Sequence, residues 1–155
     1  MDDTDLARDV AAALRGRTIA TAESFTAGRI ATALAAVEGA TDFLLGGLVA
    51  YREPVKRELL GVTAPSVLSE LAATEMAVGA RRLLGADVTV ATTGLAGPDP
   101  IDGVAPGTVF IATAVGATTG ATTHRLEGTP EEICDRATRR ALLIVKRRLG
   151  SVTAG

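Results

Sequence analysis

The sequence predicts an α/β fold in which a mixed β-sheet is covered by helices on both faces. Short β-type runs alternate with helical patterns along most of the chain, which is typical of βα units in a sheet. The first of these runs, Thr18–Ala22, passes through a short turn directly into a helical pattern. Two later β-type runs are separated only by Gly116-Ala117-Thr118, the spacing of a β-hairpin.

The first half of the chain is expected to contain three helices and two strands. In order they are a helix over Asp5–Arg15, a strand over Thr18–Ala22, a helix over Thr26–Val37, a strand over Phe43–Tyr51 and a helix over Glu53–Leu60. Apolar residues at every third or fourth position indicate the first helix. A Gly-Gly pair inside the second strand predicts a bulge or a close backbone contact. The third helix has a proline in its first turn and a glycine just beyond its end, as many helices do.

The second half is expected to contain a long helix, three strands and a final helix. These are Leu68–Leu84, then Asp87–Thr93, Thr108–Val115 and Thr119–Leu126, then Pro130–Leu149. The first of these strands is rich in β-branched residues, which favour extended structure. Basic residues close the final helix, where they complement the helix dipole.

Composition indicates one folded domain. The 155 residues are long enough to bury a core, so we expect a single domain over residues 1–155 with a flexible tail at 150–155. No apolar run is long enough and free enough of glycine and charge to span a membrane. The N-terminus is acidic and lacks the regions of a secretory signal. A single cysteine, Cys134, excludes an internal disulfide. We therefore expect a cytoplasmic protein.

Charge and rare residue types narrow the possible functions. The net charge of −2 gives no electrostatic case for direct nucleic-acid binding. Only two of the 16 basic residues are lysines, so each lysine is a candidate for a specific role. A Ser-His-Asp triad would have to use His124, the one histidine, and there are too few Cys and His residues for a zinc site built from them.

Candidate functional residues follow three of the predicted strands. Ser24, Tyr51 and Gly94 each stand at or just beyond a strand end, and ligands in such folds lie beyond the carboxyl ends of the strands. Gly94 also begins a loop, Gly94–Gly107, that holds three of the six prolines. Such a loop is either a surface connection or a lid over a ligand.

Ser24 has two interpretations. It can cap the helix that follows, as can Thr26, or its hydroxyl can serve as a nucleophile or a phosphate ligand beside free amides at the helix start. The surrounding residues match neither G-x-S-x-G nor S-x-x-K. Glu23 is either a solvated turn residue or a group that holds a substrate donor near the serine.

Tyr51 and Lys56 form a second candidate group. They can be an ordinary strand residue and an exposed helix lysine. However, Lys56 falls in the first turn of a predicted helix, where a positive charge is disfavoured and the lysine pKa should be lowered. A neutral lysine can act as the general base for a serine, and Tyr51 could relay the proton or position the base.

Together these segments resemble the C-terminal domain of the competence-damage protein CinA, the nicotinamide-nucleotide amidohydrolase family. The matching segments are Ala22-Glu23-Ser24-Phe25-Thr26-Ala27-Gly28, Gly47-Leu48-Val49-Ala50-Tyr51 with Lys56, Leu59-Leu60-Gly61-Val62, Thr93-Gly94-Leu95-Ala96-Gly97-Pro98 and Gly107-Thr108-Val109. They cover nearly the whole chain, in order and at compatible spacing.

The resemblance implies a three-layer α/β/α sandwich with a mixed, mostly parallel sheet, standing without the N-terminal molybdopterin-binding-like domain of longer relatives. It implies deamidation of nicotinamide mononucleotide to nicotinate mononucleotide and ammonia, in pyridine nucleotide salvage. A homo-oligomer is expected, with no metal and no cofactor. The catalytic residues would be Ser24, Tyr51 and Lys56, and the substrate-binding residues Glu23, Thr26, Ala27, Gly28, Gly94, Ala96, Gly97 and Thr108. Amides of the Thr26–Gly28 turn would stabilise the oxyanion.

The chain also departs from the family pattern. Phe25 stands in place of a cysteine, Ala27 in place of a glycine, and Thr129-Pro130 in place of Asp-Arg. Cys134 occupies the position of an arginine, so a phosphate would need another basic residue, with Arg136, Arg139 and Arg140 as candidates. The alternatives are therefore an amidohydrolase for a different amide, or a non-catalytic nucleotide-binding protein acting with a partner in competence or DNA repair.

Overall fold

The computed structural model describes residues 2–152 and contains a five-stranded mixed sheet. The strand order is β2 (Leu44–Val49), β1 (Ile19–Glu23), β3 (Val88–Gly94), β4 (Thr108–Val115) and β5 (Thr118–Arg125). The strand β1 pairs in parallel with both neighbours, whereas β4 is antiparallel to β3 and to β5. Strand directions are therefore mostly parallel, as predicted, while the four pairings divide equally between the two types.

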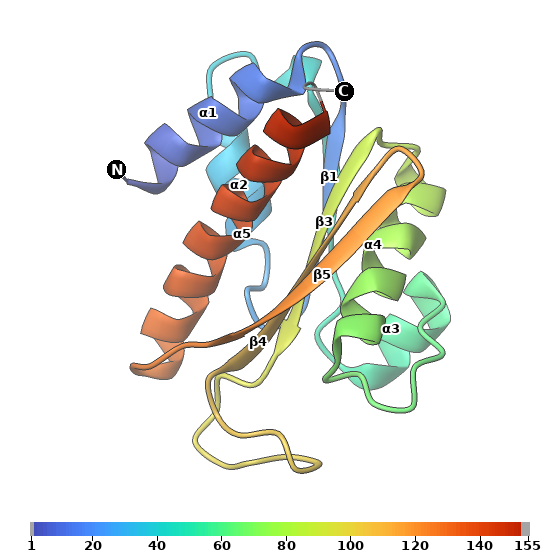
Figure 1. The fold of residues 1–155 in the computed structure, drawn as a ribbon, viewed down its shortest axis with the longest axis vertical. Helices are drawn as coiled ribbons and strands as arrows, with labels where there is room; N and C mark the ends of the chain where they lie inside the picture. The colour runs from blue at the N-terminus through green and yellow to red at the C-terminus, as the bar shows by residue number, and fades with distance from the viewer. Residues whose placement is uncertain (1, 153–155) are drawn as a thin grey trace.

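Helices cover both faces of this sheet, which confirms the three-layer α/β/α sandwich (Figure 1). One face carries α1 (Asp3–Leu14), α2 (Arg29–Ala35) and α5 (Pro130–Val152), and the other carries α3 (Glu53–Leu60) and α4 (Glu70–Leu84). A short 3₁₀ turn, η1 (Ala40–Asp42), precedes β2. Within residues 2–152, no helix has the length and apolar character needed to cross a membrane.

The two faces of the sheet are packed differently. Under α1, α2 and α5 the core consists mainly of large aliphatic side chains such as Leu6, Ile30 and Leu142. Under α4, ten of the fourteen buried residues of the core are alanines. The two layers of helices therefore pack on the sheet through side chains of different size, small under α4 and large under α5.

Most element boundaries agree with the sequence prediction to within a few residues, and two differences bear on the prediction of the site and the tail. Helix α3 begins and ends where predicted. Helix α2 begins at Arg29 rather than Thr26, because residues 26–28 form a turn. Helix α5 continues to Val152, so residues 150–152 of the expected tail are helical. The rest of that tail, residues 153–155, lies outside the described residues.

The Gly-Gly pair in β2 produces both expected features. The register of β2 on β1 shifts by one residue beside Gly46. At Gly47, a Cβ atom would lie 2.5 Å from Thr21 Oγ1 and 2.9 Å from Ala31 Cβ, closer than real Cβ atoms come to other heavy atoms. Glycine therefore allows α2 to pack directly on this edge strand.

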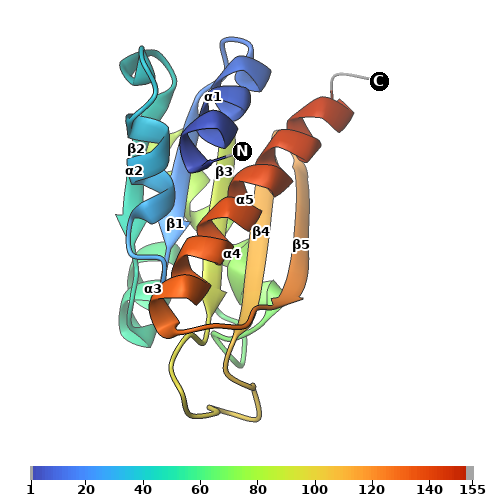
Figure 2. The same cartoon turned by 90° about the vertical axis from the view of Figure 1, so that its left-hand side faces the viewer.

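The parallel strands β1, β2 and β3 all end at one edge of the sheet. The long loop between β3 and β4 extends from the same edge, as Figure 2 shows. The predicted meeting of residues that follow these three strands is thus a consequence of the topology.

Candidate active site

Ser24 and Lys56 converge on one main-chain oxygen at this edge of the sheet. Ser24 Oγ donates to the carbonyl oxygen of Tyr51 at 3.4 Å, and Lys56 Nζ donates to the same oxygen at 2.9 Å. The serine follows β1 and the lysine lies in the first half of α3, 32 positions later in the chain. Although no direct hydrogen bond joins Oγ to Nζ within the described residues, the two groups share a hydrogen-bond acceptor.

Lys56 is a buried lysine, with 4% of its surface exposed. Burial lowers the pKa of its amine, and the nearby Glu53 carboxylate opposes that change by favouring the ammonium form. The net direction is a lowered pKa, as expected for an ammonium group taken out of water. The amine is therefore closer to a neutral base than a surface lysine would be.

Tyr51 contributes its backbone rather than its hydroxyl to this arrangement. Its side chain is 61% exposed, and its phenolic oxygen makes no hydrogen bond within residues 2–152. The expectation that the phenol relays a proton has no contact to support it. The Tyr51 carbonyl is instead the group that positions both Ser24 Oγ and Lys56 Nζ.

Glu23 is neither a solvated turn residue nor a substrate ligand in this structure. Its side chain is completely buried, and its two carboxylate oxygens accept four hydrogen bonds. The donors are Thr21 Oγ1 at 3.0 Å, Thr26 Oγ1 at 2.8 Å, and the amides of Ile30 and Ala31 at 3.0 Å each. The carboxylate therefore caps α2, whose N-cap residue provides no side-chain hydrogen bond.

Thr26 belongs to the same buried network and does not face a ligand pocket. Its hydroxyl is completely buried and donates to Glu23. Since a hydroxyl has one hydrogen, Thr26 Oγ1 must accept from Thr92 Oγ1 in their 2.8 Å contact. The interpretation of Thr26 as a helix cap is therefore wrong, because its hydroxyl is used to anchor the turn to Glu23 and β3.

The turn between Ser24 and α2 requires left-handed backbone at two successive residues. Ala27 has φ of 47° and Gly28 has φ of 93°. Glycine adopts this conformation freely, whereas alanine is strained there. The Ala27 amide is used inside the turn, donating to the Ser24 carbonyl at 3.0 Å. By contrast, the amides of Phe25, Thr26 and Gly28 donate no hydrogen bond within the described part of the chain.

A pocket of about 380 Å³ opens beside Ser24 and Lys56. Its lining comes from the ends of β1 and β3, from α3, from the segment before α4 and from the loop after β3. The lining residues are Ser24, Phe25, Tyr51, Glu53, Lys56, Val67, Leu68, Gly94, Leu95, Ala96, Gly97, Ile101 and Asp102. The structure therefore brings together six of the predicted site residues: Ser24, Tyr51, Lys56, Gly94, Ala96 and Gly97. The volume lies within the range typical of small-ligand sites.

A second hollow, of about 480 Å³, adjoins the first. The two share Phe25, Tyr51, Ala96 and Gly97 in their linings. The second hollow extends to Ala27 and to the start of α5. It also contains Arg29, a basic residue that the sequence analysis missed although it directly follows the predicted turn.

Arg29 is already partly engaged. Its Nε lies 3.3 Å from Asp135 Oδ1, and its Nη1 donates to the Thr26 carbonyl at 3.2 Å. The three arginines of α5 that the sequence suggested as phosphate ligands line neither hollow. Arg136 bonds to the Glu127 carbonyl and Arg139 pairs with Asp3, while Arg140 acts electrostatically on His124.

Thr108 and Gly28 also lie outside these two hollows. Thr108 begins β4, where its carbonyl accepts the Leu95 amide at 3.0 Å and so closes the base of the long loop. Gly28 lines a different depression, together with Asp3 and Thr32. Thr108 can therefore influence the pocket only through the position of the loop.

Phe25 lies between the core and the pocket. It is 6% exposed and belongs to the aliphatic core, yet it lines both hollows. Its ring packs on Gly94, where a Cβ atom would lie 3.0 Å from Phe25 Cε1 and 2.8 Å from the Thr108 carbonyl oxygen. A residue larger than glycine at position 94 would displace the ring or the start of β4.

The residues described by the structure include no group of three or more His, Cys, Asp or Glu side chains arranged to hold a metal ion. The one cysteine, Cys134, is buried, and burial raises the pKa of its thiol. It donates to the Phe25 carbonyl at 3.2 Å. Its place is therefore in the packing of α5 against the turn.

Comparison with known proteins identifies close structural relatives. The family model described as the CinA C-terminal domain matches residues 3–149. A solved structure of a CinA superfamily protein from Klebsiella pneumoniae superposes with a TM-score of 0.93 at 33% identity, covering 97% of this chain and 99% of that one.

Curated sequences give the same assignment. A CinA-like protein of Mycolicibacterium paratuberculosis is 42% identical over 151 residues, which cover 90% of this chain and 35% of that protein. A competence-damage inducible protein of Bacillus velezensis is 43% identical over 117 residues, which cover 71% of this chain and 28% of that protein. The chain thus spans between 28% and 35% of the length of these two relatives.

Proposed function

This chain belongs to the CinA C-terminal domain family, and we propose that it is an amidohydrolase of nicotinamide nucleotides. The reaction is the deamidation of nicotinamide mononucleotide to nicotinate mononucleotide and ammonia, and its proposed place is cytoplasmic pyridine nucleotide salvage. One observation carries the proposal: Ser24 Oγ and a buried Lys56 amine, from separate elements, share the Tyr51 carbonyl, and all three residues line one pocket.

In the proposed reaction Ser24 is the nucleophile. Its Oγ attacks the carboxamide carbon while its proton passes to neutral Lys56. Both groups contact the same carbonyl oxygen, and the proposed transfer requires a side-chain rotation that brings Nζ to Oγ. Of the three turn amides that donate no hydrogen bond, only that of Phe25 belongs to a residue that lines the pocket, so it is the candidate donor to the oxyanion.

The tetrahedral intermediate then collapses. The C–N bond breaks, Lys56 returns its proton to the leaving nitrogen, and ammonia departs, leaving an ester on Ser24. Water attacks this ester with Lys56 again accepting a proton. Release of the nicotinate nucleotide restores the serine hydroxyl, so the atoms and protons balance over the cycle with no external reactant except water.

The protonation of Lys56 predicts the pH dependence. An ammonium group cannot accept a proton, so activity should rise with pH as Lys56 loses its proton. Burial lowers the pKa of Lys56 below the ordinary value of 10.5, and the midpoint of the rise should lie below that value. The pKa of Lys56 is lower in the folded protein than in the unfolded chain. At pH values between these two, the unfolded chain binds more protons than the folded protein, so the contribution of Lys56 to folding stability increases with pH. Replacement Lys56→Met should remove the rise in activity.

A second candidate is an amidohydrolase for another amide, or a nucleotide-binding protein without turnover. It is favoured by the second hollow, which is lined by Phe25 and by Arg29, whose guanidinium is paired with Asp135. An arginine that is already paired with a carboxylate has fewer N–H donors available to a phosphate than an unpaired arginine.

A substrate panel separates these functions. Purified protein is incubated with nicotinamide mononucleotide, nicotinamide riboside, nicotinamide and simple aliphatic amides, and released ammonia is quantified at several pH values. Preference for the mononucleotide supports the proposal. Turnover confined to another amide, or mononucleotide binding without ammonia release at high enzyme concentration, supports the second candidate.

A further inference from the structure

We propose that Arg57 is a positioning residue for the Ser24–Lys56 site: it holds the Glu53 carboxylate in an ion pair and fastens it to one wall of the pocket. The kinetic part of this inference rests on the proposed function, whereas its structural part does not. Arg57 itself does not line the pocket, so it acts through Glu53 and through the segment that follows α3.

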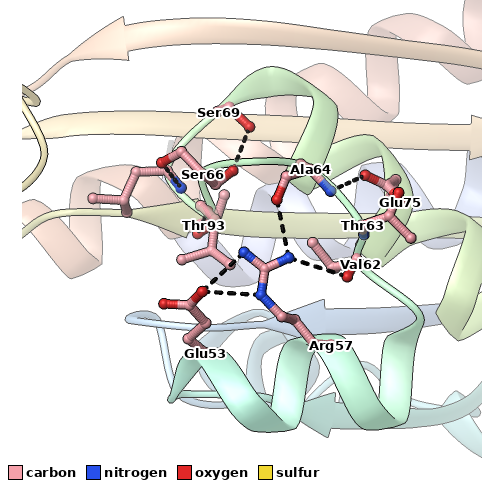
Figure 3. A network of polar contacts seen from close by, with 11 residues as sticks. Glu53, Arg57, Val62, Thr63, Ala64, Ser66, Ser69, Glu75 and Thr93 are labelled. Carbon is pink, nitrogen blue, oxygen red and sulfur yellow. Dashed lines mark hydrogen bonds and ion pairs between the residues drawn. The ribbon is translucent and has the colours of Figure 1, made fainter.

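The guanidinium of Arg57 makes four contacts, seen at the centre of Figure 3. Nε and Nη2 lie 2.9 and 2.8 Å from Glu53 Oε1. Nη1 donates to the Val62 carbonyl at 3.3 Å and to the Ala64 carbonyl at 2.9 Å. One side chain therefore joins the first turn of α3, which also carries Lys56, to the backbone beyond the end of that helix.

The segment of residues 62–67, to which Arg57 is bonded, is also held by hydrogen bonds from α4 and from β3. Glu75 of α4 accepts the amides of Thr63 and Ala64, each at 2.9 Å, and the Thr63 hydroxyl at 2.7 Å. Thr93, at the end of β3, donates to the Val67 carbonyl at 2.8 Å. Since Val67 and the next residue line the pocket, this network fixes the wall that faces Lys56.

The charge that Arg57 restrains is the one that acts on Lys56. Three other titratable side chains share the pocket with Lys56, namely Glu53 from α3, Asp102 from the long loop and Tyr51 after β2. Of these, Glu53 raises the pKa of Lys56 through its charge, against the lowering by burial. Three positions separate Glu53 from Lys56, so the two lie on neighbouring positions of one helix face.

Loss of Arg57 should therefore change the site in a defined direction. The Glu53 carboxylate would lose its partner and become free to approach the ammonium, and one nearby positive charge would disappear. Both changes stabilise protonated Lys56 and raise its pKa. A base with a higher pKa is neutral, and so able to accept a proton, only at higher pH. Arg57 therefore lowers the pH at which Lys56 can act as a base.

The direct test is to titrate Lys56 by NMR. With only two lysines in the chain, carbon-13 labelling of lysine gives two Cε signals, and Lys146→Arg assigns them. We expect Arg57→Gln to raise the pKa of Lys56 by about 1. The double variant Glu53→Gln/Arg57→Gln should lose that rise. Arg8→Gln, which removes a more exposed ion pair with Asp5 on α1, should leave the pKa of Lys56 unchanged.

Kinetics supply the second readout. Arg57→Gln should move the acid limb of the kcat profile to higher pH. If the limb moves by about 1 pH unit, activity at a fixed pH on that limb should fall about tenfold, and Glu53→Gln in the same chain should restore its position. Arg57→Lys, which keeps the charge without the planar fork, should move the limb less and provides a folded variant if Arg57→Gln does not fold.

The inference is overturned if Lys56 titrates identically in wild type and in folded Arg57 variants, or if the double variant keeps the raised pKa. The NMR titration requires no substrate. If the wild-type protein releases no ammonia, the proposed function is refuted, and the role of Arg57 is still tested by the titration.

Discussion

The turn after β1 and the loop after β3 lie at the same edge of the sheet, yet they are held in different ways. The turn, residues 24–28, is fixed by a buried carboxylate, since Glu23 accepts four hydrogen bonds and has no exposed surface. The loop is held at its base by main-chain hydrogen bonds between Leu95, Gly107 and Thr108, and its residues 98–103 are exposed.

The difference separates two tasks at one pocket. The proposed nucleophile begins the turn whose backbone is anchored from within the core by Glu23. The loop after β3 supplies one wall of the pocket, and its residues can be substituted without changing the anchored turn that holds Ser24. We therefore expect substitutions in the turn to lower both folding stability and activity. Substitutions in the loop should change ligand affinity more than stability or turnover.

Breaking the anchor should have the largest effect on stability. Glu23→Ala would leave two hydroxyls and two amides without their buried acceptor, and should lower the free energy of unfolding by about 3 kcal/mol or more. Glu23→Gln keeps the shape and should cost about half as much. Urea denaturation measures both. Glu38→Gln, at an exposed position, is the control; an equal loss there, or no loss at Glu23, would refute the anchoring role.

Relieving strain in the same turn should have a smaller, opposite effect. Ala27 adopts φ of 47°, so Ala27→Gly should raise the free energy of unfolding by about 0.5–1 kcal/mol. Ala36→Gly, at the other end of α2 with φ of −75°, should give no gain. Thermal unfolding compares the two variants. Stabilisation by both, or by neither, would mean that the positive φ at Ala27 stores no strain.

Substitutions in the loop should have the smallest effect on folding stability. Ile101 is half exposed and lines the pocket, so Ile101→Ala should change the free energy of unfolding by less than about 0.5 kcal/mol. We expect KM to rise a few-fold with kcat nearly constant, because only binding contacts are lost. A fall in kcat at unchanged KM would place Ile101 in the chemistry and blur the distinction between loop and turn.

The same contrast explains which parts of the structure could be predicted from the sequence. Helix α3 was predictable because its signals are local: a proline in the first turn and Gly61 just after the last residue. The gathering of Ser24, Tyr51 and Gly94 around one pocket followed from their places at strand ends in a βα fold. The start of α2 was not predictable, because nothing local signals an alanine in the left-handed region at Ala27.

Side-chain destinations were harder to predict than element positions. Glu23 reaches amides seven and eight residues ahead, a contact that depends on how the turn folds back over β1. Tyr51 lies past the end of β2, where strand alternation no longer states which way a side chain points, so the sequence could not distinguish its carbonyl from its hydroxyl. Arg29 was missed because the predicted helix began three residues too early.

The central claim is that Ser24 performs the chemistry with Lys56 as its base. It is tested most directly by mixing excess enzyme with nicotinamide mononucleotide and measuring ammonia and nicotinate mononucleotide over a single turnover. We predict stoichiometric formation of both products by the wild type and none by a folded Ser24→Ala variant. Equal product formation by the two proteins, or none by the wild type, would contradict the claim.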